Sequence, residues 1–340
     1  MKERHEFKKK QRQKRRKKMK QKIKRKKMDN DTDVVYFLLL GFHIGTELQI
    51  FFFIMFLSIY ILTLTANISI ITLVKLDQHL HTPMYQLLSH LSFLEIFYTS
   101  SIVPTLLPNL LQKNIISLPG CLAQTYFYFS LGTTEFFLLG VMAVDRYLAI
   151  CNPLRYTNMM NGMVCLQATA VCWLVAFLSI FVPVIMLSKL YFCGPYIINH
   201  FFCDVAPLLK LSCSDTHIME SAVFILACFT ILPSFLVTII SYVFIIVTIL
   251  RSVSKNGKQK AFSTCSSHFT VVVILYGTVI FIYVRPAFAY PVAINKFIGV
   301  FNTVITPLLN PLIYCLRNKE VKASIRKQFG RTILRNNMTH

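Results

Sequence analysis

The stretch Met142-Ala-Val-Asp-Arg-Tyr-Leu-Ala-Ile-Cys151 ends an apolar run that begins near Cys121. It sets an acid, Asp145, beside a base, Arg146, and the run before them carries one other charge, Glu135. Ionised groups at the edge of a hydrocarbon layer are costly unless they pair with each other or face a polar partner. The pair therefore predicts a charged switch at a membrane boundary, at one end of a transmembrane helix.

The composition of the whole chain favours an integral membrane protein. Charged residues make up 15% and AVILMFWYC residues 55%, whereas a soluble domain carries about a quarter charged residues. Apolar segments close to the ~20 residues that span a bilayer recur from residue 47 onwards. Because helices satisfy their own backbone hydrogen bonds in lipid, we predict an all-α, seven-transmembrane helix bundle with spans near 47–74, 83–107, 121–146, 163–187, 218–250, 261–284 and 294–316.

Positive charge is concentrated at the amino end. Residues 1–28 hold 17 Lys or Arg against two Glu, a net +15 of the +22 total. Such a block has little to bury, so we predict a disordered basic extension over 1–28. It has the composition of a nuclear signal, a nucleic-acid patch or an acidic-lipid binder; the alternative is that Met28 is the effective start. For the protein as a whole we expect no nucleic-acid partner.

Loop charges predict the orientation in the membrane. With residues 29–46 outside, the cytoplasmic stretches hold 14 Lys or Arg and the outer stretches five, as the positive-inside rule requires. We therefore expect a plasma-membrane protein with an extracellular amino end over 29–46, a seven-transmembrane domain over 47–316 and a cytoplasmic tail over 317–340. The same orientation exposes a glycosylation sequon at Asn30. The basic block opposes it, because 17 cations resist translocation.

Four cysteines fall at span ends or in loops on the predicted outer side: Cys121, Cys193, Cys203 and Cys213. Together they indicate two disulfides facing an oxidising exterior. A Cys121–Cys203 bridge would tie the loop over 188–217 across the helix mouths, and a Cys193–Cys213 bridge would close a hairpin within that loop. Four cysteines allow three pairings, and the sequence leaves the choice open.

Five motifs in order narrow the class of protein. They are Leu80-His-Thr-Pro-Met-Tyr85, Met142–Cys151 as above, Ser241-Tyr242, Lys260-Ala-Phe-Ser-Thr-Cys-Ser-Ser-His268 and Pro307-Leu-Leu-Asn-Pro-Leu-Ile-Tyr314. Together they closely resemble the vertebrate olfactory receptors, in the larger tetrapod-type (class II) branch of that rhodopsin-class G protein-coupled receptor family. The resemblance covers roughly residues 29–331. Ala66 and Val144 depart from a usual Gly and Tyr, Gln86 and Leu87 replace a usual Phe pair, and the basic block has no counterpart.

The resemblance implies an odorant receptor rather than an enzyme. A small, largely neutral volatile would bind in the outer half, and an olfactory-type stimulatory G protein would raise cyclic AMP inside. The implied switch residues are Asp145, Arg146, Tyr147, Tyr242 and Tyr314, with Arg146 leaving Asp145 to meet the G protein. The alternative for the pair is an ordinary interfacial anchor. After the last span, the spacing of Val321, Ile325 and Phe329 predicts a short amphipathic helix.

Residues three or four apart along the predicted helices lie on one side and are candidates for a ligand pocket. These are Tyr128, Phe129, Gly132, Thr133, Tyr276, Val279, Ile280, Tyr283, Val300 and Thr303. They would form a mostly apolar cleft with a few hydroxyls and no acid, suited to a neutral volatile. The alternative is that many of them are helix–helix packing contacts.

Two acids, Glu95 and Glu135, lie inside apolar runs, and intramembrane acids are functional candidates by default. The resemblance implies a shared Na⁺ ion, acting as a structural modulator, near Asn67, Glu95, Glu135 and Asn310. The alternative is that one or both carboxyls are protonated. No other cofactor is expected.

Two other functions fit a polytopic membrane protein. A transporter or channel predicts internal repeats, or broken helices with several charges at mid-membrane, and the sequence shows no repeat and two buried acids. The other is a chemosensory receptor that acts outside the nose.

Overall fold

A computed structural model describes residues 35–42, 45–112, 114–193, 195–251, 266, 268–280, 292–317 and 321–326. The predicted basic extension, the sequon at Asn30, Tyr283 and the first part of the sixth span lie outside these residues, as does the side chain of Tyr314.

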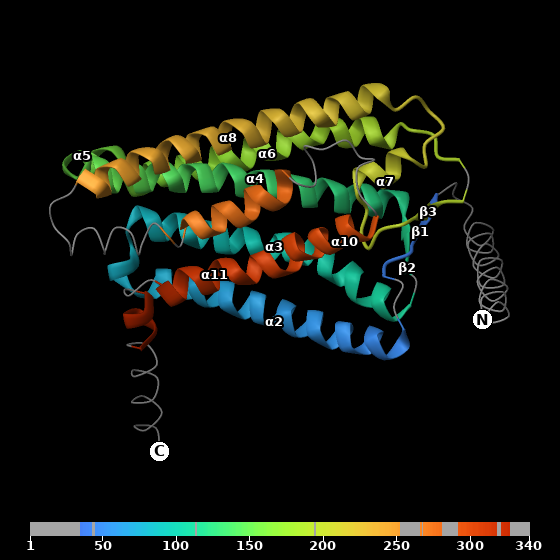
Figure 1. The fold of residues 1–340 in the computed structure, drawn as a ribbon, viewed down its shortest axis with the longest axis horizontal. Coiled ribbons are helices and arrows are strands. Elements are labelled where there is room, and N and C mark those ends of the chain that lie inside the picture. The colour runs from blue at the N-terminus through green and yellow to red at the C-terminus, as the bar shows by residue number, and fades with distance from the viewer. Residues whose placement is uncertain are drawn as a thin grey trace, which may run out of the picture.

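The described chain is a bundle of long apolar helices (Figure 1). Five continuous helices are α2 (Thr46–Leu76), α3 (Pro83–Leu111), α4 (Leu118–Cys151), α6 (Gly162–Ser188) and α8 (His217–Arg251). A sixth span joins α10 (Val292–Val300), η2 (Phe301–Ile305) and α11 (Thr306–Arg317). These six are long and apolar enough to cross a membrane, and a shorter apolar helix, His268–Ile280, lies within the remaining predicted span. The prediction of a seven-helix membrane bundle is confirmed.

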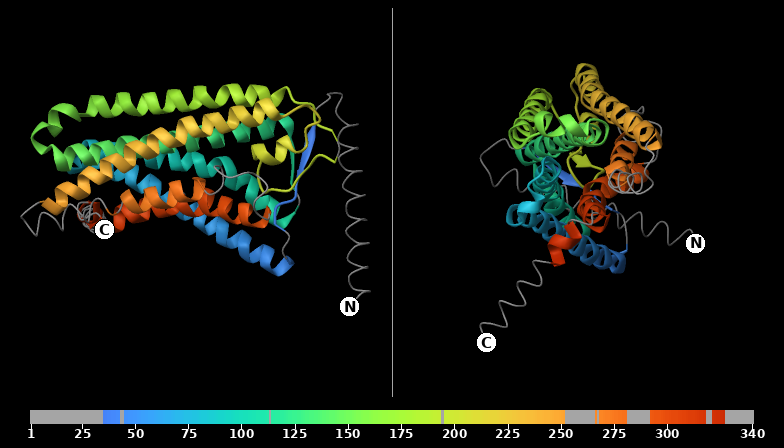
Figure 2. Two further views of the ribbon diagram at one scale, coloured as in Figure 1. Left: turned by 45° about the horizontal axis from the view of Figure 1, so that its top comes forward. Right: turned by 90° about the vertical axis from the view of Figure 1, so that its left-hand side faces the viewer.

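Helix α4, which carries the Asp145-Arg146 pair, lies at the centre of the bundle. It contacts α3, α6 and α8, and the end-on view of Figure 2 shows the other helices grouped around it. In its most apolar stretch 67% of residues are buried by protein, against 11% for α2 and 22% for both α6 and α8. The outer faces of those three helices are apolar and would meet lipid, so α4 is the element best placed to connect the two ends of the molecule.

Two of the long helices, α4 and α6, begin with a side-chain cap. Ser117 Oγ accepts from the Gly120 amide at 3.3 Å at the start of α4, and Asn161 Oδ1 accepts from the Val164 amide at 3.0 Å at the start of α6. Both satisfy amides that have no partner within the helix. In the last span the five residues of η2 form a π-helical turn, a geometry frequent at functional sites.

A three-stranded sheet covers one end of the bundle, which we call the sheet end. Strand β1 (Tyr36–Leu39) lies between antiparallel β2 (Asn114–Ser117) and parallel β3 (Ile197–Ile198), seen at the right of Figure 1. Phe37 and Leu39 of β1 are fully buried beside both cysteines of the first disulfide. The segment that precedes the first span is thus part of a lid over the sheet end.

The chain turns sharply after β1, at Gly41. Its φ of +57° lies in the left-handed region, and a Cβ built there would come within 2.9–3.1 Å of the Asn109 side chain. Glycine is therefore required at this position for both its conformation and its lack of a side chain.

Short elements complete the fold. Helix α5 (Pro153–Met159) follows α4 at the other end of the bundle, η1 (Gln78–Leu80) links α2 to α3, and α7 (Val205–Leu209) lies in the long loop at the sheet end. Residues 321–326 form the helix predicted after the last span, with Val321 buried; Phe329 lies outside the described residues.

Candidate functional site

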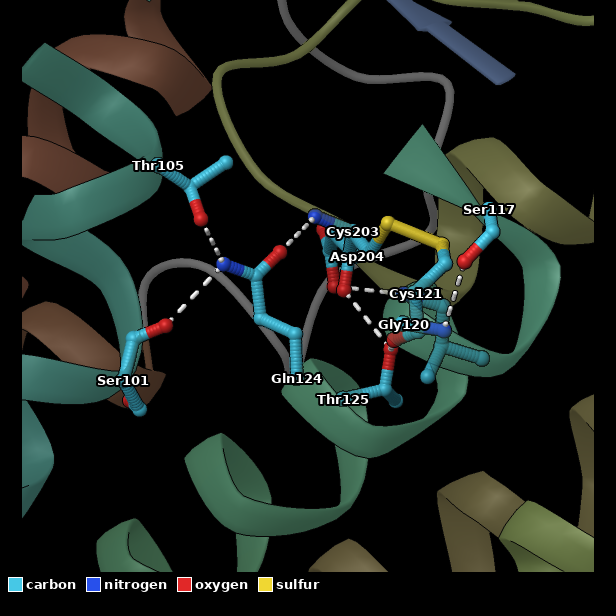
Figure 3. Close-up of a disulfide and its surroundings, with 10 residues drawn as sticks. Ser101, Thr105, Ser117, Gly120, Cys121, Gln124, Thr125, Cys203 and Asp204 are labelled. Carbon is cyan, nitrogen blue, oxygen red and sulfur yellow. Dashed lines mark hydrogen bonds between the residues drawn. A yellow bond between two sulfur atoms is a disulfide. The ribbon is translucent and has the colours of Figure 1, made fainter. Parts of the chain in front are cut away.

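Two disulfides hold the lid at the sheet end. Cys121 joins Cys203, with Cα atoms 5.4 Å apart, and Cys193 joins Cys213, with Cα atoms 5.8 Å apart. The first attaches the long loop to the start of α4 (Figure 3) and the second closes a hairpin within the loop. Of the three possible pairings, the structure contains the one that places the loop across the helix mouths.

Gln124 and Thr125 reinforce the first disulfide (Figure 3). Gln124 Nε2 donates to Ser101 O and Thr105 Oγ1, both at 3.0 Å, and its Oε1 accepts from the Cys203 amide at 3.0 Å. Thr125 Oγ1 lies 2.9 Å from Cys203 O. These bonds join α3, α4 and the loop in one polar cluster. Sequence reasoning missed Gln124, although an amide one turn after a cysteine in an apolar run was a usable signal.

Lys296 clasps the lid to the last span. Its amine is buried and donates to Gly41 O at 2.6 Å and to Asn199 Oδ1 at 2.9 Å. Three segments far apart in the sequence thus share one cation. The neighbouring His200 is buried as well, and burial together with the positive charge of Lys296 lowers the pKa of its imidazole to about 3. From the sequence, Lys296 is only one of the five cations on the predicted outer side; a cation at the start of an apolar span was the signal for this contact.

Asp204 follows Cys203 and begins α7. Its Oδ1 accepts from the Val205 amide at 2.8 Å, and desolvation raises the pKa of the carboxyl to about 6. This cap fixes the short helix whose first residue, Val205, reaches the cavity below.

Beneath the lid lies a cavity that contains about 860 Å³ of space free of protein atoms, part of it open to the surroundings. Five of the predicted pocket residues line it: Tyr128, Phe129, Gly132, Thr133 and Val279. Further walls come from α6 and α8, which contribute Pro183, Val184, Met219, Val223 and Leu226 among others, and Tyr98, Glu135 and Asn302 also belong to the lining. Glu135 corrects the expectation of a cleft without an acid.

Four predicted pocket residues do not line this cavity: Tyr276, Ile280, Val300 and Thr303. Tyr276 is buried against Phe136, and its hydroxyl donates to Ser234 Oγ at 2.9 Å. Thr303 bonds back to Gly299 O at 2.9 Å, while Val300 and Ile280 pack into the hydrophobic core. The physical reason is that the rotation of each helix about its axis decides which side faces the cavity, and residue spacing does not determine that rotation.

The intramembrane acids lie together deeper in the bundle. Asn310 Nδ2 donates to Glu95 Oε1 and reaches Glu135 Oε1 at 3.4 Å. Asn67 lies nearby through its contact with Pro307 O, at 3.4 Å from Nδ2. Glu95 Oε2, Asn67 Oδ1 and Asn310 Oδ1 are buried and have no hydrogen-bond partner among the described residues. Oxygen ligands of this kind suit a hard cation, so these residues fit a Na⁺ ion.

At the other end of the bundle, Arg146 pairs with Asp145 through both Nε and Nη2, the Nε contact at 3.0 Å. Tyr156 on α5 donates to Asp145 Oδ1 at 2.8 Å. Burial and the Asp145 charge raise the pKa of the Tyr156 phenol, which therefore stays a donor. Asp145 is 1% exposed and Arg146 12%, so the pair is almost shielded from solvent.

A second contact at this end joins α8 to the helix over His268–Ile280. Tyr242 Oη lies 2.6 Å from His268 Nδ1, with both side chains buried. The sequence contains no Asp or Glu between Glu220 and Glu320, so the sixth span has no acid to pair with Arg146. The contact between His268 and Tyr242 joins these two helices instead. Tyr147 packs on Phe244.

The central helix α4 therefore runs from a lidded cavity to a charge pair at the opposite end of a seven-helix membrane bundle. This architecture is that of a rhodopsin-class G protein-coupled receptor. The sequence profile of the olfactory receptor family matches residues 56–332. Human olfactory receptor 6F1 is 50% identical over 294 residues, 86% of this chain and 96% of that receptor. Rat olfactory receptor 287 is 48% identical over 292 residues, 86% of this chain and 94% of the relative.

The chain belongs to the olfactory receptor family. It is accordingly a multi-pass plasma-membrane receptor for odorants that couples to G proteins, and it is not an enzyme. The resemblance seen in the motifs is confirmed.

Proposed function

We propose that this receptor binds a small, largely neutral volatile in the cavity beneath the lid and activates an olfactory-type stimulatory G protein, raising cyclic AMP. The cavity supports the first part because its lining is predominantly apolar, with few polar groups, as in small-molecule sites generally. Glu135 is the ionisable carboxyl in that lining, and Asn310 already reaches it at 3.4 Å. The observation that carries the proposal is that one helix, α4, contributes both to the cavity wall and to the Asp145-Arg146 pair.

The chemistry at the two ends supports an orientation with the sheet end outside. Both disulfides lie at the sheet end, which suits an oxidising exterior. The end with Arg146 and Arg155 would then face the cytoplasm, in agreement with the positive-inside rule. In this orientation the lid covers the side from which an odorant arrives.

The resting state would be held by the Asp145-Arg146-Tyr156 cluster and by the Tyr242–His268 contact. A ligand shifts such a two-state equilibrium only if it binds one state more tightly than the other. When the sixth span moves outward, Arg146 would leave Asp145 for the carboxyl-terminal helix of the G protein, with Tyr147, Tyr242 and Tyr314 around the opening.

Filling the cavity tests the ligand site. Gly132 lies on the cavity wall, and a Cβ there would meet the Tyr98 ring at 3.6 Å, an ordinary contact. We expect Gly132→Phe to place its ring in the cavity and to reduce odorant potency at least about tenfold, since ~1.4 kcal/mol of lost binding has that effect. The measurement is odorant-evoked cyclic AMP normalised to receptor at the cell surface.

Gly132→Ala is the matched control, because its methyl group fits and its response should stay near that of the wild type. Undiminished potency in Gly132→Phe at equal surface expression would show that the odorant binds elsewhere.

We also propose that Na⁺ binds between Glu95, Glu135, Asn67 and Asn310 and stabilises the resting receptor. A ligand that binds only the folded resting state raises its stability with concentration. The melting temperature of purified receptor should therefore rise when choline chloride is exchanged for NaCl at constant ionic strength. Glu95→Gln should abolish this dependence because it removes a charged ligand. A melting temperature indifferent to Na⁺ in the wild type would refute the site.

A further inference from the structure

The cavity carries an amide whose orientation determines which ligands it recognises. Asn302 occupies the second position of the π-helical turn η2 and lines the cavity, while only 4% of it is exposed. In the structure Asn302 Oδ1 faces the Thr278 hydroxyl, and Nδ2 makes no hydrogen bond within the described part of the chain. Asn302 is thus a buried polar group with one end committed to a neighbour and the other available to a ligand.

The hydroxyl of Thr278 decides which end is available. Its oxygen lies 2.9 Å from both Ile274 O and Leu275 O of its own helix and 3.3 Å from Asn302 Oδ1. A threonine hydroxyl has one hydrogen to donate and two lone pairs that accept. Because the hydroxyl hydrogen donates to one of these helix carbonyls, which are nearer than Asn302, the Thr278 oxygen is left as an acceptor towards Asn302.

The two ends of a carboxamide exchange by rotation about its terminal torsion, and the hydrogen-bond network decides between them. With Nδ2 toward Thr278, the pair forms two hydrogen bonds, from hydroxyl to helix carbonyl and from amide to hydroxyl. With Oδ1 toward Thr278, the single hydroxyl hydrogen can donate either to the helix carbonyl or to Asn302 Oδ1, so only one of these two hydrogen bonds forms. A buried group left without its bond is costly, so the first arrangement is favoured.

We infer that the Asn302 carboxamide is turned relative to its orientation in the structure, so that Nδ2 meets the Thr278 hydroxyl and the carbonyl oxygen faces the cavity. The receptor then selects ligands with a hydroxyl group, small apolar alcohols, over ligands with only an acceptor oxygen. The inference rests on the proposed function of the cavity as the odorant site. A ligand hydroxyl donates to Asn302 Oδ1, whereas an ether or aldehyde oxygen of the same length meets another acceptor. The apolar walls accommodate the carbon chain in either case.

Sites built around one polar group discriminate strongly, because the wrong ligand leaves that group unpaired. The test uses saturated alcohols of about six to ten carbons with their chain-matched methyl ethers and aldehydes, assayed by cyclic AMP on the full-length receptor. We expect each active alcohol to be at least about tenfold more potent than its matched ether and aldehyde.

Two variants separate recognition from fold, with surface expression measured for each. Asn302→Leu has similar volume and no polar end, so alcohol potency should fall at least about tenfold while the ethers are little changed. Thr278→Val keeps the shape and removes the hydroxyl that orients the amide. The freed amide can then offer Nδ2 to an acceptor, so the alcohol-to-ether potency ratio should fall towards one. A merely structural loss in Thr278→Val would lower both ligand types together.

The outcomes are distinct. Equal potency of alcohols and ethers in the wild type, or an unchanged ratio in Asn302→Leu, overturns the inference. A receptor that responds to other odorants in a broad panel but to no alcohol overturns the inference and leaves the proposed function intact. A receptor that responds to no odorant overturns both.

Discussion

A receptor carrying Arg146→Ala should reach the cell surface in normal amounts and give no odorant-evoked rise in cyclic AMP. The Arg146 side chain pairs with Asp145 and is 12% exposed, so its loss removes the group that would meet the G protein. Asp145 keeps the hydrogen bond from Tyr156 at 2.8 Å, and this bond still stabilises the fold of the variant. Evoked cyclic AMP should fall to the basal level at every odorant concentration.

Arg155→Ala is the matched control. Arg155 is an exposed cation on α5, so its removal changes the net charge at the same end without disturbing the Asp145 cluster, and the response should persist. Full signalling by Arg146→Ala at equal surface expression would show that the Asp145-Arg146 pair is only an interfacial anchor and not a switch.

Replacing both Cys121 and Cys203 by serine should prevent the receptor from reaching the cell surface. The bridge spans 82 residues and the second bridge 20. A chain-entropy model assigns about 4.5 and about 3.3 kcal/mol to loops of these lengths. The first bridge also anchors the cluster around Gln124, whose Oε1 accepts from the Cys203 amide at 3.0 Å. We therefore expect a larger loss than for the second bridge, measured as receptor at the surface by flow cytometry.

Two controls accompany this experiment. The Cys193→Ser, Cys213→Ser double variant should retain part of the surface receptor, because it opens only the hairpin within the loop. Cys228→Ser removes a thiol outside both bridges and should behave as wild type. Normal surface levels without the Cys121–Cys203 bridge would show that the lid does not depend on it.

Length and hydrophobicity were enough to predict the bundle. The expected span over 121–146 corresponds to α4, although the helix extends further, from Leu118 to Cys151. It continues because a helix satisfies its own backbone beyond the apolar stretch, and Ser117 supplies the cap. The sheet was not predicted. Its strands are four, four and two residues long and come from segments far apart in the sequence, so no local pattern reveals them.

The site was predictable as a set of residues but not as a geometry. Glu135 was expected in the acid cluster, yet it also lines the cavity, because the depth of the cavity depends on side chains from several other helices. Tyr276 and Val279 were both expected in the cavity wall, but only Val279 lines the cavity. Residues one turn apart lie on the same side of a helix, but the spacing does not say what that side faces. Asn302 was not predicted at all, because its role depends on the π-helical turn and on Thr278.

We propose that ligand binding at one end of α4 activates a G protein at the other. The most direct measurement is odorant-evoked cyclic AMP in cells that lack endogenous stimulatory Gα subunits, with and without added olfactory-type Gα. We expect a rise in cyclic AMP that depends on both the odorant and the added Gα and is absent in Arg146→Ala. An odorant response that persists without any stimulatory Gα, as an ion current or a transport flux through the protein itself, would contradict it.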